Sequence, residues 1–135
     1  GAHCGVITDA SFPTYLLSHW VRDRSRGERF SLEKAVAAQT SGTAALYGLH
    51  DRGIVAPGMK ADLNVIDFDA LQLHEPKMVH DLPAGGRRLI QEISGYRYTI
   101  VSGVITYEDG TPTGKLPGKL IRGIQHADAE KLAAE

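Results

Sequence analysis

The apolar pattern of the chain changes its period near Asp51, and this change constrains the fold more than any other feature of the sequence. Before Asp51, apolar residues recur at helical spacing, as Leu16, Leu17 and Trp20 do. After it, turns that contain glycine or proline separate short runs rich in β-branched residues, which is typical of a sheet. The sequence therefore predicts an α+β fold, with N-terminal helices followed by strands.

Three helices are predicted in the N-terminal part. The first has Ser11 as its N-cap and Pro13 in its first turn, where a missing N–H costs nothing, and it ends at Gly27. The second opens at Ser31, and a short third helix covers residues 43–47. These boundaries follow from the capping residues and the glycines rather than from the apolar pattern alone.

Three strands are the clearest expectations in the C-terminal part. One covers residues 61–67, and two more at 98–101 and 104–107 are joined by a tight turn at Ser102-Gly103. Asp109-Gly110 is expected to close that hairpin. The sequence thus predicts an antiparallel hairpin beside a further strand.

The first of these strands also predicts which side chains share a face. Side chains alternate along a strand, so Leu63 and Val65 should lie on one face and Ile66 on the other. So few strands cannot cover both faces of a sheet by themselves. We expect the helices to close one face and a separate element to close the other.

The domain organisation follows from these elements. Residues 1–50 are predicted to be helical, and residues 51–123 to form the sheet portion. Within the sheet portion, residues 71–95 are predicted to form a long loop, and long loops in compact domains are usually functional lids or packing arms. Residues 124–135 are expected to be a short tail.

Composition narrows the class of protein. The 135 residues are 42% apolar and 23% charged, and 15 basic against 16 acidic side chains give a net charge of −1, which does not favour nucleic-acid binding. No apolar run approaches the ~20 residues that span a bilayer. The single cysteine, Cys4, favours a reducing compartment, so we expect a cytoplasmic chain. Four arginines alternate with acidic residues near the end of the first helix, which favours a solvated helix end: Arg22, Arg24, Arg26 and Arg29.

Two groups of side chains could ligate a metal. His3-Cys4 close to Asp9 could be a ligand pair, or a nucleophile with its base. Metal sites need three or four ligands, and no second CxxC or HxH is present, so an incidental pairing is favoured. His74-Glu75 and His80-Asp81 match no zinc spacing, and loop anchoring is favoured for them.

The remaining polar clusters have simpler interpretations. Gly85-Gly86-Arg87-Arg88 could bind an anionic group, because arginine pairs with carboxylates through two hydrogen bonds, although a turn is the more frequent role of paired glycines. Lys60, Asp62 and Asp67 flank a strand and are expected to be solvated or to cap turns. The chain has no GxSxG, no HExxH and no phosphate-binding loop, so the residues alone predict a domain without a complete active site.

Several segments nevertheless resemble the C-terminal end of the amidohydrolase superfamily. Residues 53–67 are similar to its passage G-x-I-x-P-G-x-x-A-D-L-V-V-x-D, and residues 101–107 resemble the hairpin V-x-x-G-x-x-V that follows. Narrower motifs resemble the N-acyl-D-amino-acid deacylases, which are the D-aminoacylase-like members of amidohydrolase family 3. These motifs are Gly1-Ala2-His3, Thr14-Tyr15-Leu16-Leu17, Trp20-Val21-Arg22, His80 to Leu89, and Thr113 to Lys119.

The resemblance implies a fold and a missing catalytic centre. Residues 1–50 would end a catalytic (β/α)8 barrel, and residues 51–123 would belong to a small β-sandwich. In this family one or two metal ions, usually zinc, activate water, and an Asp in a Ser-Asp-Ala-Gly-Ala-His sequence acts as general base and acid. That Asp would lie just before residue 1, and the metal ligands are absent as well. Only His3 carries over, as a group beside the substrate or supporting the site, with packing beneath a loop as an equal alternative.

The resemblance also implies an activity for a parent protein. The parent would hydrolyse the amide bond of N-acyl-D-amino acids, and the isolated chain is expected to be inactive. A cyclic amidohydrolase of the hydantoinase or dihydropyrimidinase kind is the alternative enzyme, and a non-catalytic binding or oligomerisation module is the alternative outside enzymes. The expected partners are the rest of the parent barrel, a small N-acyl amino acid substrate, and further copies of the chain in a homo-oligomer.

Overall fold

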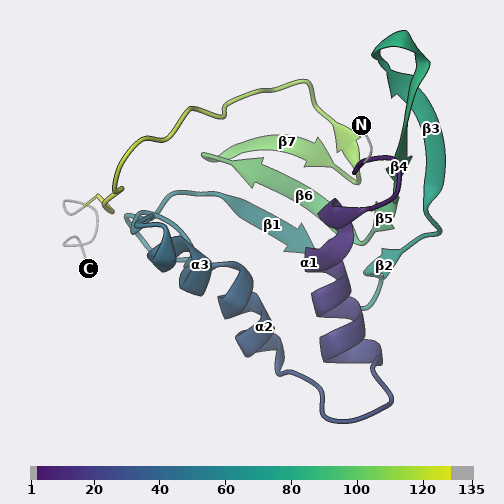
Figure 1. Ribbon diagram of the computed structural model, residues 1–135. Helices are drawn as coiled ribbons and strands as arrows, with labels where there is room; N and C mark the ends of the chain where they lie inside the picture. Colours follow the sequence, from purple (N-terminus) through teal and green to yellow (C-terminus); the bar gives the residue numbers. More distant parts are fainter. Residues whose placement is uncertain (1–2, 129–135) are drawn as a thin grey trace.

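A computed structural model describes residues 3–128 of the chain (Figure 1). Helices occupy the N-terminal part, and strands occupy the rest, which confirms the predicted α+β fold. The helical elements are η1 (Asp9–Ser11), α1 (Phe12–Tyr15), η2 (Leu16–Asp23), α2 (Leu32–Gln39) and α3 (Ser41–Leu46). The strands are β1 (Leu63–Ile66), β2 (Gln72–Leu73), β3 (Lys77–Leu82), β4 (Gly86–Ile90), β5 (Ile93–Ser94), β6 (Tyr96–Val101), β7 (Val104–Glu108) and β8 (Thr111–Pro112), with a 3-10 turn, η3 (Pro83–Gly85), before β4.

The first predicted helix is built from three continuous segments, η1, α1 and η2. Ser11 does not cap it, because its backbone is helical (φ −87°, ψ −12°) and its Oγ donates to the carbonyl of Thr8 at 2.7 Å. The predicted N-cap is therefore wrong, since η1 continues the helix one turn further toward the N-terminus. From Leu16 onward the turns widen to a π-helix, which ends where the Arg24 N–H donates to the carbonyl of His19 at 2.8 Å.

The other two helices follow the sequence signals more closely. Ser31 has an extended backbone, and its side chain accepts a hydrogen bond from the Lys34 N–H at 3.3 Å, which confirms the predicted N-cap of α2. The third helix begins at Ser41 rather than at residue 43. The break between α2 and α3 lies at Thr40, whose backbone leaves the helical region (φ −126°, ψ −92°).

The strands form a four-stranded antiparallel sheet in the order β1-β6-β7-β8 and two separate two-stranded ladders, β2-β5 and β3-β4. The turn at Ser102-Gly103 has positive φ at both residues (51° and 78°), which confirms the predicted tight hairpin. Asp109-Gly110 makes a second turn of this kind (44° and 76°) and leads into β8, so the hairpin continues into a third strand.

Residues 71–95 were predicted to form a long loop, and this prediction is wrong. They contain β2, β3, β4 and β5, and the β3-β4 hairpin extends away from the helices (Figure 1). Both faces of that hairpin are largely open to solvent, so its sequence shows no alternation of apolar and polar residues. Its tip is a turn in which Ala84 and Gly85 both have positive φ (57° and 69°).

The alternation predicted for β1 is interrupted. The pairing of β1 with β6 shifts register between Val65 and Ile66, which is a β-bulge. Leu63 and Ile66 are both half-buried, whereas Val65 is exposed. Ile66, which lies beyond the bulge, packs against the core.

The core lies where the first helix meets the β2-β5 ladder. Leu71 is completely buried (0% exposed), and Leu17 and Ala35 are nearly so. Thr14, also buried, shares a hydrogen bond of 2.9 Å with the hydroxyl of Tyr96 on β6. This polar contact joins the helical part to the sheet beside the apolar core.

Arg22 makes the second connection between helix and sheet. Its Nη2 donates to the carbonyl of Leu71 at 2.8 Å, and its Nη1 donates to the carbonyls of Phe68 and Asp69. Asp23 holds the same guanidinium from the helix side at 2.7 Å. The prediction of a solvated helix end is therefore wrong for Arg22, which binds the turn between β1 and β2.

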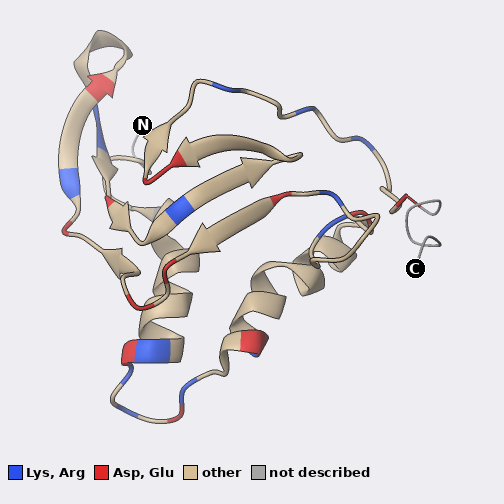
Figure 2. Cartoon of the chain, turned by 180° about the vertical axis from the view of Figure 1, so that it is seen from behind, with Lys and Arg blue, Asp and Glu red and all other residues tan. Residues whose placement is uncertain are grey.

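Charged residues of both signs are interspersed along the chain, as the colours of Figure 2 show. The segment that follows β8 is the exception, because Lys115, Lys119 and Arg122 follow one another there without an acidic residue between them. Among the described helices, none is both long and apolar enough to cross a bilayer.

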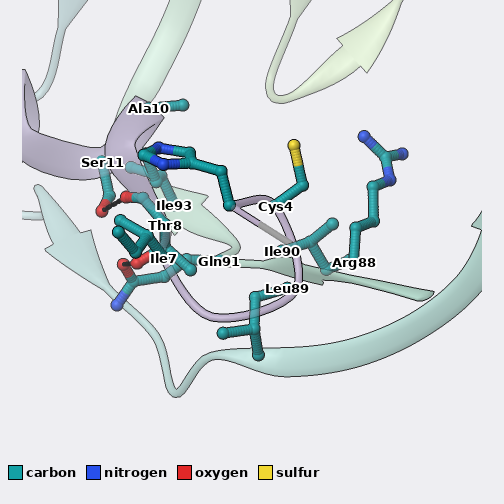
Figure 3. A pocket seen from close by; sticks show the side chains of 11 residues that line it. Cys4, Ile7, Thr8, Ala10, Ser11, Arg88, Leu89, Ile90, Gln91 and Ile93 are labelled. Carbon is teal, nitrogen blue, oxygen red and sulfur yellow. Dashed lines mark hydrogen bonds between the residues drawn. The ribbon is translucent and has the colours of Figure 1, made fainter. Parts of the chain in front are cut away.

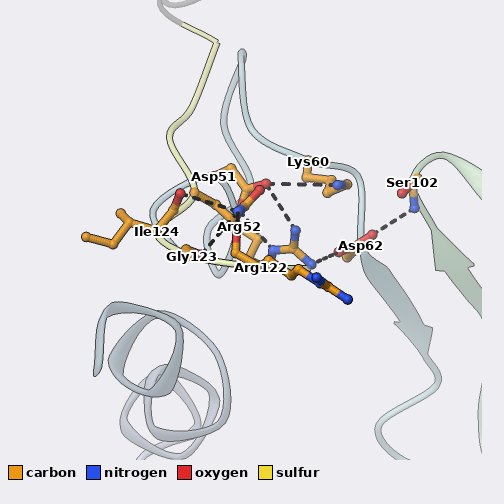
Figure 4. A network of polar contacts seen from close by, with 9 residues as sticks. Asp51, Arg52, Lys60, Asp62, Ser102, Arg122, Gly123 and Ile124 are labelled. Atoms are coloured by element: carbon orange, nitrogen blue, oxygen red, sulfur yellow. Dashed lines mark hydrogen bonds and ion pairs between the residues drawn. The ribbon is translucent and has the colours of Figure 1, made fainter. Parts of the chain in front are cut away.

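A network of ion pairs fixes the linker between α3 and β1 (Figure 4). Arg52 donates to both Asp51 carboxylate oxygens and, through Nη1, to Asp62 at 2.9 Å. The other oxygen of Asp62 accepts the Ser102 N–H at 2.7 Å. Through these bonds the linker is attached to the turn between β6 and β7, and Lys60 adds a fourth charge 4.0 Å from Asp51.

Replacing Gly95 with alanine should strongly destabilise the chain. Gly95 has a φ of 99°, and a Cβ there would lie 2.6 Å from the Cα of Leu71. We expect a loss of about 3 kcal/mol or more in the free energy of unfolding, because backbone strain adds to a clash with backbone atoms. Gly103→Ala is the control, since its φ is also positive (78°) but nothing lies within 4 Å, so it should cost only about 1 kcal/mol. Urea denaturation of both variants tests this, and equal losses would contradict it.

Asp51 should make the stability of the chain sensitive to acid. The Arg52 guanidinium beside Asp51 lowers the pKa of that carboxyl below its ordinary 3.8. The stabilisation is therefore complete above about pH 3.8 and is lost as the pH falls through the lowered pKa of the folded state. Asp51→Asn should be less stable than the parent at pH 7, and the difference should shrink toward pH 3. Urea midpoints between these pH values measure it, with Glu75→Gln, an exposed carboxylate, as control; a difference that does not change with pH would refute the role.

The chain should self-associate when it is isolated. Large apolar side chains are widely exposed, among them Leu116 (94%), Val55 (87%) and Leu46 (80%), and β1 lies at an open edge of the sheet. Sedimentation velocity over a range of concentrations should show oligomers, and Val55→Lys should shift them toward monomer more than Ser25→Lys does. A clean monomer at high concentration would contradict this expectation.

Candidate functional site

A pocket of about 390 Å³ lies between the N-terminal segment and the β3-β4 hairpin (Figure 3). The N-terminal segment contributes the polar side chains of His3, Cys4 and Thr8, and the hairpin side contributes Arg88 and Gln91. The apolar lining comes from Ile7, Leu89, Ile90 and Ile93. A cavity of this size with apolar walls and a few polar groups is typical of a site for a small molecule.

Backbone hydrogen bonds hold the two walls of the pocket together. The carbonyl of His3 accepts the N–H groups of Val6 and Ile7, so the segment turns tightly just before η1. The carbonyl of Cys4 accepts the N–H of Leu89 at 2.7 Å, which attaches this turn directly to β4. The pocket therefore depends on a contact between residues that lie more than 80 positions apart in the sequence.

At one end of the pocket, Arg88 forms a two-bonded ion pair with Asp81. Its Nε and Nη2 donate to the two carboxylate oxygens at 2.8 and 2.7 Å, across the β3-β4 ladder. The Arg88 guanidinium lowers the pKa of the Asp81 carboxyl, and the same hydrogen bond raises the pKa of Arg88. Both side chains are about half exposed (45% and 50%), so the pair orients the guanidinium while leaving it open to solvent.

At the other end of the pocket, one polar contact is weak and two are well formed. The Thr8 hydroxyl lies 3.5 Å from the Gln91 Oε1, at the outer limit of a hydrogen bond. The Gln91 Nε2 donates to the carbonyl of His74 at 2.8 Å, and the Ser11 hydroxyl is bonded to the carbonyl of Thr8. The Thr8 hydroxyl is thus the group best able to change partner when a ligand enters.

The structure places two members of the first predicted cluster at this pocket. His3 and Cys4 both line it and are exposed to solvent. The side chain of Asp9, the third member of the predicted cluster, lies outside the described residues. The predicted role of His3 beside a substrate stays a prediction, although its position on the pocket wall is now known.

The second predicted cluster has structural contacts. His74 contacts the hydroxyl of Ser94 at 3.1 Å, and Asp81 pairs with Arg88, so these side chains support the hairpins. Among the described side chains, which do not include that of Asp9, no three histidine, cysteine, aspartate or glutamate side chains are grouped so that they could hold a metal ion. The described residues therefore do not fit a zinc site on their own, and no catalytic step can be assigned to a metal bound by them.

Asp62 and Asp67, which flank β1, have the capping roles expected of them. Asp62 accepts the Ser102 N–H, and Asp67 accepts the Ala70 N–H at 3.1 Å in the turn before β2. Asp67 also pairs with Arg97 at 2.9 Å. These contacts make both side chains parts of the scaffold.

Gly85-Gly86-Arg87-Arg88 forms the predicted turn. It also places an arginine at the pocket, in line with the anion-binding role that the sequence favoured less. The glycines lie at the tip of the hairpin and at the start of β4, and the two arginines then project from neighbouring positions of β4. Arg88 reaches the pocket, whereas Arg87 does not line it. Thr8 and Gln91 were missed altogether, because they become neighbours only when the N-terminal turn crosses β4, and no local sequence signal marks such a crossing.

Comparison with known proteins identifies the scaffold to which this pocket belongs. Residues 2–107 match the amidohydrolase family, which is more than half of the chain. The chain belongs to the amidohydrolase family. Within this family the chain is similar to N-acyl-D-glutamate deacylase of Alcaligenes xylosoxydans xylosoxydans, with 30% identity over 109 residues that make up 81% of this chain and 20% of that protein.

A second relative matches a shorter stretch. Adenine deaminase of Desulfatibacillum aliphaticivorans is 38% identical over 61 residues, which are 45% of this chain and 10% of that enzyme. The chain therefore spans a fifth or less of the length of these curated relatives. No solved structure matches the chain significantly.

Proposed function

We propose that this chain is a structural portion of a hydrolase that cleaves the amide bond of N-acyl-D-amino acids. The observation that carries the proposal is the similarity to an N-acyl-D-glutamate deacylase, which extends over 81% of the chain and includes both the helices and the sheet. The residues predicted to be typical of these deacylases, His80 to Leu89, form the β3-β4 hairpin and one wall of the pocket.

The chemistry of such an enzyme is metal-assisted, with zinc lowering the pKa of a bound water and polarising the amide carbonyl. We propose that residues outside this chain hold the zinc and the catalytic Asp, because the described residues offer no group of three ligands. In this proposal His3 contributes a polar group near the reacting amide from the wall of the pocket.

We further propose that the helices end a catalytic barrel and that the strands belong to a β-sandwich. The order of elements, helices first and an antiparallel sheet after them, supports this arrangement. So does the exposure of apolar side chains on both parts, including Leu46 at the end of α3 and Ile105 on β7, since exposed apolar surface marks sites of contact. The partner of these surfaces is then the remainder of the same enzyme.

A second candidate function is the deamination or ring opening of a cyclic substrate. The match to an adenine deaminase favours it, because its identity is higher, at 38%. That match covers less than half of the chain, whereas the match to the deacylase covers 81%. The longer alignment supports the deacylase as the first candidate.

Assays of the complete polypeptide that contains this chain test the proposal. We expect zinc-dependent release of acetate from N-acetyl-D-glutamate or N-acetyl-D-alanine, with much slower reaction of the L-enantiomers, which serve as the matched control. The 135-residue chain by itself should release no acetate above background at the same zinc concentration. Ammonia release from adenine, or ring opening of dihydrouracil, without any deacylation would favour the second candidate and reject the first.

A further inference from the structure

Among the described side chains that line the pocket beside β4, Arg88 is the only arginine or lysine, and no aspartate or glutamate is present. Asp81 accepts from Nε and from one N–H of Nη2, and no hydrogen bond joins Nη1 to another of the described side chains. A guanidinium has five N–H donors, so this one can bind a further anionic group while its present ion pair persists.

The arrangement of the pocket matches a small molecule with a charged end and an amide end. In Figure 3, the Arg88 guanidinium and the Cys4 thiol lie toward one end, and Thr8, Ser11 and Gln91 lie toward the other. Apolar side chains, including that of Ile90, lie between these two ends of the pocket. The single cation suits a monoanion such as a carboxylate, because a phosphate with about two charges is usually held by more than one cationic group.

We propose that this pocket binds the free carboxylate of an N-acyl amino acid, with Arg88 as the residue that determines specificity for it. The choice of an N-acyl amino acid as the ligand rests on the proposed function, whereas the carboxylate site rests on the geometry of the pocket. The amide of the bound molecule lies near Thr8, whose hydroxyl exchanges its weak contact with Gln91 for a bond to the ligand. The side chain of the ligand lies against the apolar wall.

Three variants of the 135-residue chain separate this role from a structural one. Arg88→Gln removes the cation and also breaks the ion pair with Asp81. Asp81→Asn breaks the same ion pair but leaves the cation in place. Arg87→Gln is the matched control, because Arg87 is the neighbouring residue on β4, is exposed and does not line the pocket.

Titration with N-acetyl-D-alanine, followed by amide chemical shifts, measures the binding. At ~10 mM ligand, above a weak Kd of about 1 mM, we expect shifts at Thr8, Leu89 and Gln91. The corresponding carboxamide, N-acetyl-D-alaninamide, should bind about tenfold more weakly, since it lacks the charge. Arg88→Gln should weaken binding of the acid by a similar factor and leave binding of the amide unchanged, and Arg87→Gln should change neither.

The Asp81→Asn variant distinguishes binding of the ligand by Arg88 from a purely structural role of its ion pair with Asp81. If Arg88 binds the ligand, this variant keeps or increases affinity, because the guanidinium loses a competing partner. The proposal is overturned if Asp81→Asn weakens binding as much as Arg88→Gln does, if the acid and the amide bind equally, or if the acid produces no shifts. Hydrolysis is not measured in these titrations, so a failure of binding here and a failure of deacylation in the complete polypeptide are separate results.

Discussion

The attachment of Arg22 to the turn between β1 and β2 is the interaction on which the rest of the structure depends. The guanidinium donates to the carbonyls of Phe68, Asp69 and Leu71, and so supplies hydrogen-bond donors to the backbone of this turn. With the turn held in this way, the side chain of Leu71 is placed in the centre of the core and is completely buried.

The backbone beside Leu71 is packed so closely that position 95 must be a glycine. Gly95 approaches the backbone of Leu71 so closely that only a residue without a Cβ fits, and the carbonyl of Gly95 accepts the Asp67 N–H at 2.8 Å. The β2-β5 ladder begins beside Gly95. Its position therefore depends on Leu71, the same residue to which Arg22 attaches the helix. Helix, turn and ladder form one unit, and the β3-β4 hairpin extends from that unit.

Outside this unit, the described part of the chain has little apolar core. Its buried apolar side chains are Leu17, Ala35, Ala44 and Leu71. Ion pairs and turn hydrogen bonds, such as those of Arg52 and Asp62, hold the linker and the sheet in place, and partly exposed pairs of this kind contribute modestly to stability. The proposed role as the scaffold of a larger hydrolase is consistent with this balance, because a partner surface would bury the apolar side chains that this chain leaves exposed.

The parts of the fold that sequence reasoning predicted are those governed by local chemistry. Ser102-Gly103 specifies its turn through backbone conformation, and Ser31 caps α2 through a hydrogen bond three residues away. The bulge at Val65 and the early start of the first helix were not predictable, because pairing with β6 and packing against the sheet determine them. The same limit applied to the site: His3 and the Arg87-Arg88 pair were recognisable by residue type, but Thr8 and Gln91 were not.

The β3-β4 hairpin shows how the scaffold and the site are connected. An isolated two-stranded hairpin is only marginally stable in water, and this one is supported on one side by the N-terminal turn through the bond between Cys4 and Leu89. The ion pair of Asp81 with Arg88 crosses the two strands close to that contact, so the residue that stabilises the hairpin is also the cation of the pocket. The position of the guanidinium in the pocket therefore depends on the hairpin as a whole, and a change in the length or turn of the hairpin would move it. The stretch from His80 to Leu89 contains both the ion pair and the turn that joins its two strands, so this stretch, rather than Arg88 alone, sets the geometry of that end of the pocket.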